Sequence, residues 1–284
     1  MGAKPVVLGA VAYDAKVVTI WDGFQRWFQG RGLPFDYVLF SNYERQVESQ
    51  FDGTIEVAWN SPLAWLQASR IAAALGRRAE AIAMRDSDCD LSSILLVRAS
   101  SDLARLSDLK GKRVATGAPD SPQATLIPLG HLAAEGLAPG TDFEVVMFDR
   151  LAGKHGDHVG GERDAARALA KGEADAACIL DANHLLFSQD GTLATGSVRV
   201  LGRTAPYDHC NFTVVGAPSP GIARFRELLL SMRYADPEVR ALFDLEGLKE
   251  WRPGRTGGYA TLAQAVDRFG TIDAFVASVA SRCA

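Results

Sequence analysis

Long apolar runs are absent from this 284-residue sequence. A membrane-spanning helix needs about 20 mainly apolar residues, and no uninterrupted run approaches that length. Apolar residues nevertheless make up 48% of the chain, which is enough to build a buried core. We therefore expect a globular protein that is not inserted in a membrane.

An excess of positive charge is also missing. The chain has 30 Lys and Arg residues against 34 Asp and Glu residues, which gives a net charge of −4 with neutral histidines. A nucleic-acid-binding surface normally requires clustered basic side chains. We therefore expect no nucleic-acid partner.

Cysteine is scarce, and no C-x-x-C pair occurs. Cys89, Cys178, Cys210 and Cys283 are widely separated in the chain, which argues against a zinc ribbon or a thioredoxin-like redox site. Cys178 lies within the apolar segment 176–180. We therefore expect reduced thiols rather than two disulfides.

The N-terminal segment lacks the features of a secretory signal. Residues 6–12 form a short apolar run that is closed by Tyr13, Asp14 and Lys16, whereas a signal has a longer apolar core and a small-residue cleavage site. The run is typical of a buried strand. Two localisations stay open: cytoplasmic if Met1 is the native start, and periplasmic or extracytoplasmic if the chain is a processed form.

What the sequence does contain is an alternation of short β-like runs and amphipathic helical segments. Strands are expected at residues 6–10, 37–40, 56–59, 81–84, 93–98, 113–117, 143–148, 174–180, 198–202 and 212–215. Helices are expected at residues 17–28, 63–75, 125–135, 162–171, 222–234, 237–245 and 262–280. This alternation predicts an α/β protein with largely parallel sheets, and the length suits about two domains.

Two of the expected helices begin with the same polar pattern. Asn60, Ser61 and Pro62 follow one strand, and Ser121 and Pro122 follow another. Serine as N-cap with proline at the first helical position strongly predicts a helix start. Either start alone is explained by capping, but two of them at the carboxyl ends of strands favour a bound anion.

Several segments carry a resemblance to a known family. They are Glu-Val-Ala-Trp at 56–59, Leu-Leu-Val-Arg at 95–98, Leu-Ser-Asp-Leu-Lys-Gly-Lys-Arg-Val-Ala at 106–115, and the segments 164–177 and 254–259. With these segments the sequence resembles the phosphate/phosphonate-type substrate-binding proteins of ABC transporters, which have the type II periplasmic-binding fold. The resemblance covers nearly the whole chain.

This resemblance implies two α/β lobes that are joined by two hinge crossings and clamp a ligand in the cleft between them. The first lobe is expected at residues 1–97 and 206–284, with the second lobe inserted at 98–205. The implied function is binding of a small anionic ligand, either an oxyanion or a phosphonate-like compound. An ABC transporter permease or another protein is the implied partner.

The sequence departs from the family at the second-lobe helix start. Phosphonate binders have a Ser-Thr-Ser-Gly-type segment there, whereas this chain has Ser121, Pro122, Gln123 and Ala124. One hydroxyl is kept, one position becomes proline, and an amide is added. Thr125 can supply a further hydroxyl. The expected ligand-binding residues are Tyr13, Trp59, Asn60, Ser61, Ser121, Gln123, Thr125, His158 and His209.

Three further segments carry polar clusters. Residues 85–90 place three aspartates on alternate positions, but the Gly and Glu of an EF-hand do not follow, so a solvated turn is favoured. The glycine-rich loop 154–162 contains His155, Asp157, His158 and Glu162, which are suitable metal ligands or acid–base groups. This loop is the most functional-looking in the chain.

The third segment contains Asp208, His209 and Cys210. These side chains can bind a soft metal, or His209 can activate Cys210 as a nucleophile. Adjacent residues of a strand face opposite ways, so a direct pair of His209 and Cys210 is not expected.

An alternative function therefore stays open, a cytoplasmic metal-dependent enzyme of hydrolase or lyase type on the same fold. Its catalytic candidates are His155, His158, His209 and Cys210. Its divalent-metal candidates are His155, Asp157, His158, Glu162 and Asp208. A divalent metal is the one cofactor that this alternative implies.

Overall fold

The computed structural model describes residues 4–156 and 160–284, which form two compact units. Unit 1 comprises the residues up to Cys89 together with Asp208–Tyr259 and Ile272–Ala284. Unit 2 comprises Asp90–Tyr207 and Ala260–Thr271. None of the described helices is both long and apolar enough to cross a membrane.

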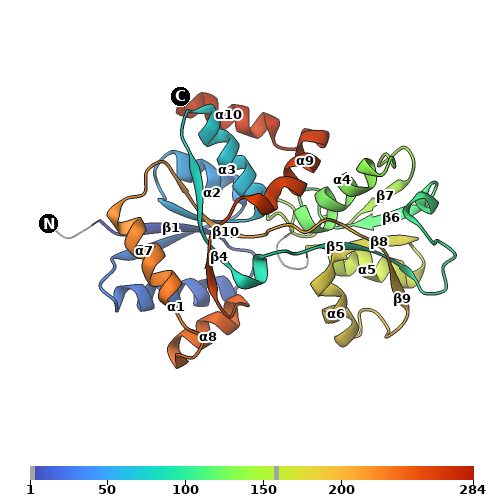
Figure 1. The fold of residues 1–284 in the computed structure, drawn as a ribbon, viewed down its shortest axis with the longest axis horizontal. Helices are drawn as coiled ribbons and strands as arrows, with labels where there is room; N and C mark the ends of the chain where they lie inside the picture. Colours follow the sequence, from blue (N-terminus) through green and yellow to red (C-terminus); the bar gives the residue numbers. More distant parts are fainter. Residues whose placement is uncertain (1–3, 157–159) are drawn as a thin grey trace. The chain divides into compact units, whose positions relative to one another are not determined.

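Unit 1 is built on a six-stranded sheet with the order β11-β4-β10-β3-β1-β2. Figure 1 labels β1, β4 and β10 of this sheet. Its strands are β1 (Val6–Val11), β2 (Phe35–Phe40), β3 (Val57–Asn60), β4 (Ala79–Arg85), β10 (Asn211–Val215) and β11 (Trp251–Pro253). Its helices are α1 (Lys16–Gln29), α2 (Tyr43–Phe51), α3 (Pro62–Ala74), α7 (Pro220–Ser231), α8 (Pro237–Glu246) and α10 (Asp273–Cys283), with short 3-10 turns η1 (Asp86–Asp88) and η4 (Gly257–Tyr259).

Unit 2 is built on a five-stranded sheet with the order β7-β6-β8-β5-β9. Its strands are β5 (Ser93–Arg98), β6 (Arg113–Thr116), β7 (Glu144–Met147), β8 (Ala176–Leu180) and β9 (Val198–Arg203). Its helices are the 3-10 turn η2 (Leu106–Leu109), the π-helical turn η3 (Pro122–Leu126), α4 (Ile127–Ala134), α5 (Glu162–Lys171), α6 (Asp181–Gln189) and α9 (Ala260–Phe269).

The expected α/β class is confirmed, but the sheets are mixed rather than largely parallel. In unit 1, β1 runs parallel to β2 and β3, whereas β10 runs antiparallel to β3 and β4. In unit 2, β6 runs parallel to β7 and β8, whereas β5 runs antiparallel to β8 and β9. Strands β5 and β10 lie shortly after points where the chain enters a unit, and β11 runs antiparallel to β4, so these strands do not belong to a simple β-α-β succession.

The division into units differs from the expected lobe boundaries. Strand β5 belongs wholly to unit 2 because it pairs with β8 and β9, so the first boundary lies at Cys89 rather than at Val97. The second boundary lies at Tyr207. A further excursion, Ala260–Thr271, carries α9 into unit 2, so the chain passes between units at four points instead of two.

The single helix expected at 262–280 is two helices, because the chain breaks at Gly270. This glycine has a φ of 63°, a left-handed conformation that ends α9. Helix α9 packs on α4 so closely that a Cβ at Gly130 would lie 2.7 Å from the Cβ of Ala265. Helix α10 packs instead on α3 in unit 1.

Each unit has its own apolar core. In unit 1, the predicted aromatic stripe of α1 is buried against β10, β11 and α7. In unit 2, Ile94 and Leu96 of β5 face one apolar cluster, whereas Leu95 and Val97 face another. A strand that is buried on both faces in this way holds its neighbours rigidly and positions the loops at its ends.

Candidate functional site

A buried polar segment of unit 2 lies between the end of β6 and η3. Ser121 is the N-cap, with its Oγ accepting a hydrogen bond from the Ala124 N–H at 3.3 Å and Pro122 in the first helical turn. The predicted helix start is therefore confirmed. The helix opens as a π-helical turn, with the Leu126 N–H donating to the Ser121 carbonyl at 2.9 Å, and continues directly into α4.

A glycine-rich segment, residues 153–156, is tied to this helix start. Oδ2 of Asp120 accepts from the N–H groups of Gly153 and His155, at 2.6 and 3.3 Å. Nε2 of Gln123 donates to the Gly156 carbonyl at 2.8 Å. Gln123, which was expected to contact the ligand, is thus at least partly a positioning residue that holds this segment against η3.

Two hydroxyl groups at the start of η3, those of Ser121 and Thr125, are buried and donate no hydrogen bond to a described residue. Ser121 is fully buried and Thr125 is 2% exposed. Within residues 4–156 and 160–284, the Ser121 hydroxyl only accepts, and Oγ1 of Thr125 has no hydrogen-bond partner. A buried donor without an acceptor costs about 1–3 kcal/mol, so both groups favour an additional acceptor.

Unit 1 contains the second predicted helix start. Oγ of Ser61 accepts from the Ala64 N–H at 3.2 Å, which confirms it as the N-cap of α3. Oδ1 of the fully buried Asn60 accepts from Nε2 of Gln46 at 2.7 Å. Nδ2 of Asn60 has no hydrogen-bond acceptor in the described part of the chain.

The two aromatic candidates of unit 1 differ in their surroundings. Trp59 is 5% exposed, and its ring lies 4.6 Å from that of Phe212 and 5.7 Å from that of Trp251, measured between centroids. Its place in strand β3 therefore makes it a core residue, and the ligand role expected for it has no support in unit 1. Tyr13 is half-buried just after β1 and packs on the edge of the same core.

The described residues form no cluster of the metal ligands that were expected around the loop 154–162. Asp157 and His158 lie outside those residues. Oε2 of Glu162 accepts from the Leu180 N–H at 2.7 Å and from Nδ2 of Asn183 at 2.8 Å, so this carboxylate joins α5 to the end of β8. His155 is buried in the same unit.

Asp208, the remaining member of that set, belongs to unit 1 and forms an ion pair. Its two carboxylate oxygens accept from Nε and Nη2 of Arg255, at 2.7 and 2.5 Å. The Asp208 side chain is fully buried. This bidentate pair connects the beginning of the segment Asp208–Tyr259 of unit 1 to the residues just before η4.

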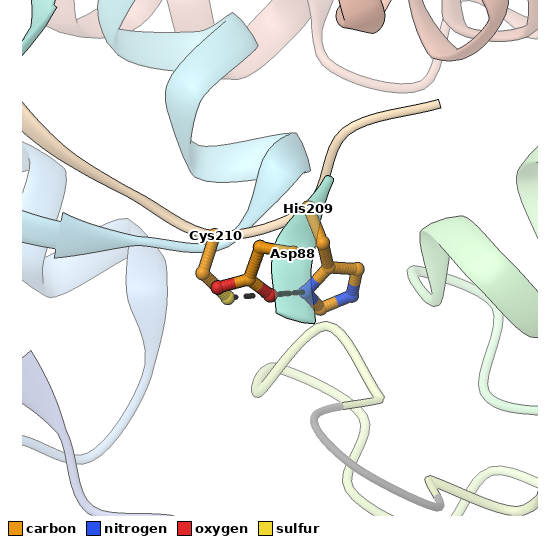
Figure 2. A group of neighbouring side chains, drawn as sticks. All are labelled: Asp88, His209 and Cys210. Carbon is orange, nitrogen blue, oxygen red and sulfur yellow. Dashed lines mark hydrogen bonds and ion pairs between the residues drawn. The ribbon is translucent and has the colours of Figure 1, made fainter. Parts of the chain in front are cut away.

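A different polar cluster forms where η1 meets the residues before β10 (Figure 2). Nδ1 of His209 lies 3.1 Å from Sγ of Cys210 and 3.5 Å from Oδ1 of Asp88. The prediction that His209 and Cys210 do not form a direct pair is wrong. It assumed strand alternation, but both residues precede β10, where the backbone is irregular and the His209 N–H donates to the Asp88 carbonyl.

The interpretation of residues 85–90 as a solvated turn is wrong for Asp88, which is buried. It is 2% exposed, and Arg85 donates to both of its oxygens, at 2.5 and 2.9 Å. Burial alone would raise the pKa of Asp88, but the charge of Arg85 and the hydrogen bond with His209 outweigh it and lower the pKa to about 2. Arg85 also pairs with Glu246.

None of the four cysteines, all within the described residues, forms a disulfide bond. Cys178 is fully buried in β8, where burial and, to a lesser extent, the nearby Glu162 raise the pKa of its thiol to about 12. That thiol therefore stays protonated and acts as a small apolar core group.

Comparison with known proteins agrees with this architecture. PhnD1 from Prochlorococcus marinus, in complex with methylphosphonate, superposes with a TM-score of 0.68 at 15% identity, covering 95% of this chain and 99% of that one. A Xanthomonas citri protein bound to ATP gives a TM-score of 0.67 at 17% identity over 98% of each chain. The periplasmic aliphatic sulphonate binding protein SsuA from Escherichia coli gives 0.59 at 17% identity, over 96% and 88%.

At these identities the solved structures establish the fold, which is that of type II periplasmic-binding proteins. The family itself is established by the sequence. A family model described as "ABC transporter, phosphonate, periplasmic substrate-binding protein" matches residues 10–259, which is most of the chain. The chain therefore belongs to the family of periplasmic substrate-binding proteins of phosphonate ABC transporters, components that bind small anionic ligands.

Proposed function

We propose that this protein binds a small organic phosphonate or sulfonate, whose anionic oxygens accept hydrogen bonds from Ser121 and Thr125. The observation that carries the proposal is the buried pair of hydroxyl groups that donate to no described residue. Methylphosphonate bound to PhnD1, and the sulphonates for which SsuA is named, are tetrahedral anions of this class. Family membership supports the same ligand chemistry.

The chemistry of the helix start fits a tetrahedral anion. The N-terminus of a helix carries a partial positive charge, and hydrogen bonds to an anion are stronger than those between neutral groups. The segment 153–156 holds the helix start in place through Asp120 and Gln123, so the donors are preorganised before a ligand arrives. Net charge of the whole chain matters less than these local donors.

Family membership supports a proposal for the partner and the compartment. We propose that the loaded protein delivers its ligand to the permease of an ABC transporter on the extracytoplasmic side of the membrane. Co-purification with the permease in the presence of ligand, and cell fractionation, test these two points. Nothing in the described residues supports the enzyme alternative: Glu162 accepts from the Leu180 N–H and Asp208 pairs with Arg255, while Asp157 and His158 lie outside those residues.

Isothermal titration calorimetry tests the ligand class. The panel is methylphosphonate, methanesulfonate, phosphate and phosphite, titrated into the wild type and into Ser121→Ala and Thr125→Val. At least one panel member should bind with a micromolar or lower Kd. Each variant should weaken that ligand about 10- to 100-fold, because each removes a hydrogen bond to a charged group.

Ser219→Ala is the matched control. Ser219 caps α7 in unit 1 with the same Ser-Pro pattern, and its Oγ accepts from the Ile222 N–H at 3.3 Å. The variant therefore loses a helix cap, worth about 1 kcal/mol of stability, without touching the proposed site. Absence of binding across the panel, or an equal loss in Ser219→Ala, would overturn the proposal.

A further inference from the structure

Three buried side chains of unit 1 point toward a common position, and the anion proposal leaves them without a role. Asp88 follows β4 in η1, and His209 and Cys210 directly precede β10 (Figure 2). One potential ligand atom from each residue lies within 4.8 Å of the other two. A carboxylate oxygen, an imidazole nitrogen and a thiol sulfur form a typical donor set for zinc.

The two separations from Nδ1 of His209 fit a tetrahedral ion. Ligand atoms at 2.0–2.3 Å from a tetrahedral zinc ion lie about 3.3–3.6 Å from each other. Nδ1 of His209 lies 3.1 Å from Sγ of Cys210 and 3.5 Å from Oδ1 of Asp88. These two separations lie near the expected ones, and the third pair, a carboxylate oxygen of Asp88 and Sγ of Cys210, lies within 4.8 Å.

The surroundings hold these ligands in place. Arg85 donates to both oxygens of Asp88, and the Asp88 carbonyl accepts from the His209 N–H at 2.8 Å. A carboxylate oxygen has two lone pairs, so Oδ1 can accept from Arg85 and still bind an ion. Such supporting hydrogen bonds orient metal ligands in known sites.

The buried charge of the cluster also favours a divalent cation. Arg85 contributes one positive charge, whereas Asp88 and Glu246 contribute two negative charges. A Cys210 thiolate would bring the total to −2, and all four side chains are nearly or fully buried. A doubly charged cation balances this total, and buried charges require such compensation.

We propose that Asp88, His209 and Cys210 form a binding site for a thiophilic divalent cation, best matched by Zn²⁺, with water at the fourth coordination position. Asp88 takes the place of Asp208, the carboxylate predicted from the sequence, because Asp208 forms an ion pair with Arg255. A thiolate among the ligands selects zinc over magnesium or calcium. All three ligands belong to unit 1, whereas Ser121 and Thr125 belong to unit 2, so this proposal and the anion proposal can fail separately.

The test uses untagged full-length protein that is stripped with a chelator, incubated with Zn²⁺ and desalted. Elemental analysis should find about one equivalent of zinc. Replacement by Co²⁺ should give the visible bands of a tetrahedral ion and a near-ultraviolet band of cobalt–thiolate charge transfer. Less than about a tenth of an equivalent of zinc together with no thiolate band overturns the proposal without any variant.

Variants assign the ligands. Cys210→Ser should abolish the thiolate band and, like His209→Gln and Asp88→Asn, weaken zinc binding by about 100-fold or more. Cys89→Ser is the matched control, because Cys89 adjoins Asp88 but lies outside the cluster, and it should keep both the band and the affinity. Loss of the band in Cys89→Ser with its retention in Cys210→Ser would assign another site.

Alkylation of the wild-type protein tests the metal–thiolate bond without relying on variants that fold poorly. Bound zinc should protect Cys210 of the wild-type protein from alkylation, as mapped by peptide mass spectrometry, and removal of zinc by a chelator should reverse the protection. Equal alkylation of Cys210 with and without zinc would contradict a metal–thiolate bond.

Discussion

Gly156 lies directly against Ser121 in unit 2: a Cβ at position 156 would stand 2.6 Å from both Cβ and Oγ of Ser121. Gly156 also has a φ of 61°, a conformation that other residues rarely adopt. Its carbonyl accepts from Gln123 at 2.8 Å. The absence of a side chain at 156 thus lets the loop backbone close over the start of η3, where the anion-binding hydroxyls are proposed.

Gly156→Ala should therefore weaken ligand binding more than its effect on stability explains. The added Cβ must displace the Ser121 hydroxyl, and we expect a loss of affinity of about tenfold or more, with about 1–2 kcal/mol of backbone strain. Gly191→Ala is the control, because Gly191 also has a positive φ but open space around it. Calorimetry and urea unfolding on both variants separate the two effects, and equal affinities would contradict the role given to Gly156.

Removal of Arg85 from its buried ion-pair network should destabilise unit 1. Arg85→Met leaves the carboxylates of Asp88 and Glu246 buried, with side-chain exposures of only 3% and 4%. We expect a loss of about 3–5 kcal/mol in the free energy of unfolding, because an uncompensated buried charge is costly. Urea unfolding followed by tryptophan fluorescence measures it, since Arg85 lies 5.1 Å from the Trp59 ring.

Arg105→Ala provides the comparison for that variant. Arg105 pairs with Asp108 but its side chain is 81% exposed, so we expect a change within about 1 kcal/mol. Similar losses in the two variants would show that the Arg85 network is solvated.

Cys178 should make the protein sensitive to alkali. Burial raises the pKa of its thiol to about 12 from an ordinary value of 9.0. The unfolded chain loses this proton at lower pH than the folded chain does. The contribution of the Cys178 thiol to the free energy of unfolding is therefore intact below pH 9.0. It falls by about 1.4 kcal/mol per pH unit between pH 9.0 and about 12. Tyr207, whose pKa is raised by burial, adds a loss of the same sign at higher pH.

Cys178→Ala isolates this contribution. The difference in unfolding free energy between the wild type and the variant should be constant from about pH 6 to pH 8 and should then change in favour of the variant. Urea unfolding at intervals of pH measures the difference. A difference that stays constant up to pH 10.5 would mean that the thiol titrates normally.

The contact of α9 with α4 should be revealed by a double-mutant cycle. Gly130→Ala adds a Cβ that would lie 2.7 Å from the Cβ of Ala265, and we expect this overpacking to cost about 1–3 kcal/mol despite the higher helix propensity of alanine. Ala265→Gly removes the opposing Cβ, so the double variant should recover most of that loss. Additive changes would show that the two helices do not touch at this point.

Much of the local structure could be predicted because its causes are local. Strand β5 and helix α5 have the bounds that hydrophobic periodicity predicts, residues 93–98 and 162–171. The Ser-Pro pattern correctly predicts the caps at Ser61 and Ser121, where a side chain bonds an amide three residues on. The same pattern caps α7 at Ser219, so it predicts a helix start wherever it occurs in these helices. Helix α2 was missed, because its buried residues include two glutamines.

The tertiary structure alone decided which polar groups meet. Sequence spacing pointed to Asp208 beside His209 and Cys210, but the fold turns Asp208 toward Arg255 and brings Asp88 from a distant segment instead. Likewise, only the fold shows that Gly156 abuts Ser121 and that α9 leaves unit 1 to pack on α4. Periodicity and capping act over a few residues and are therefore visible in the sequence, whereas contacts between distant segments depend on strand order and on packing, which no short pattern encodes.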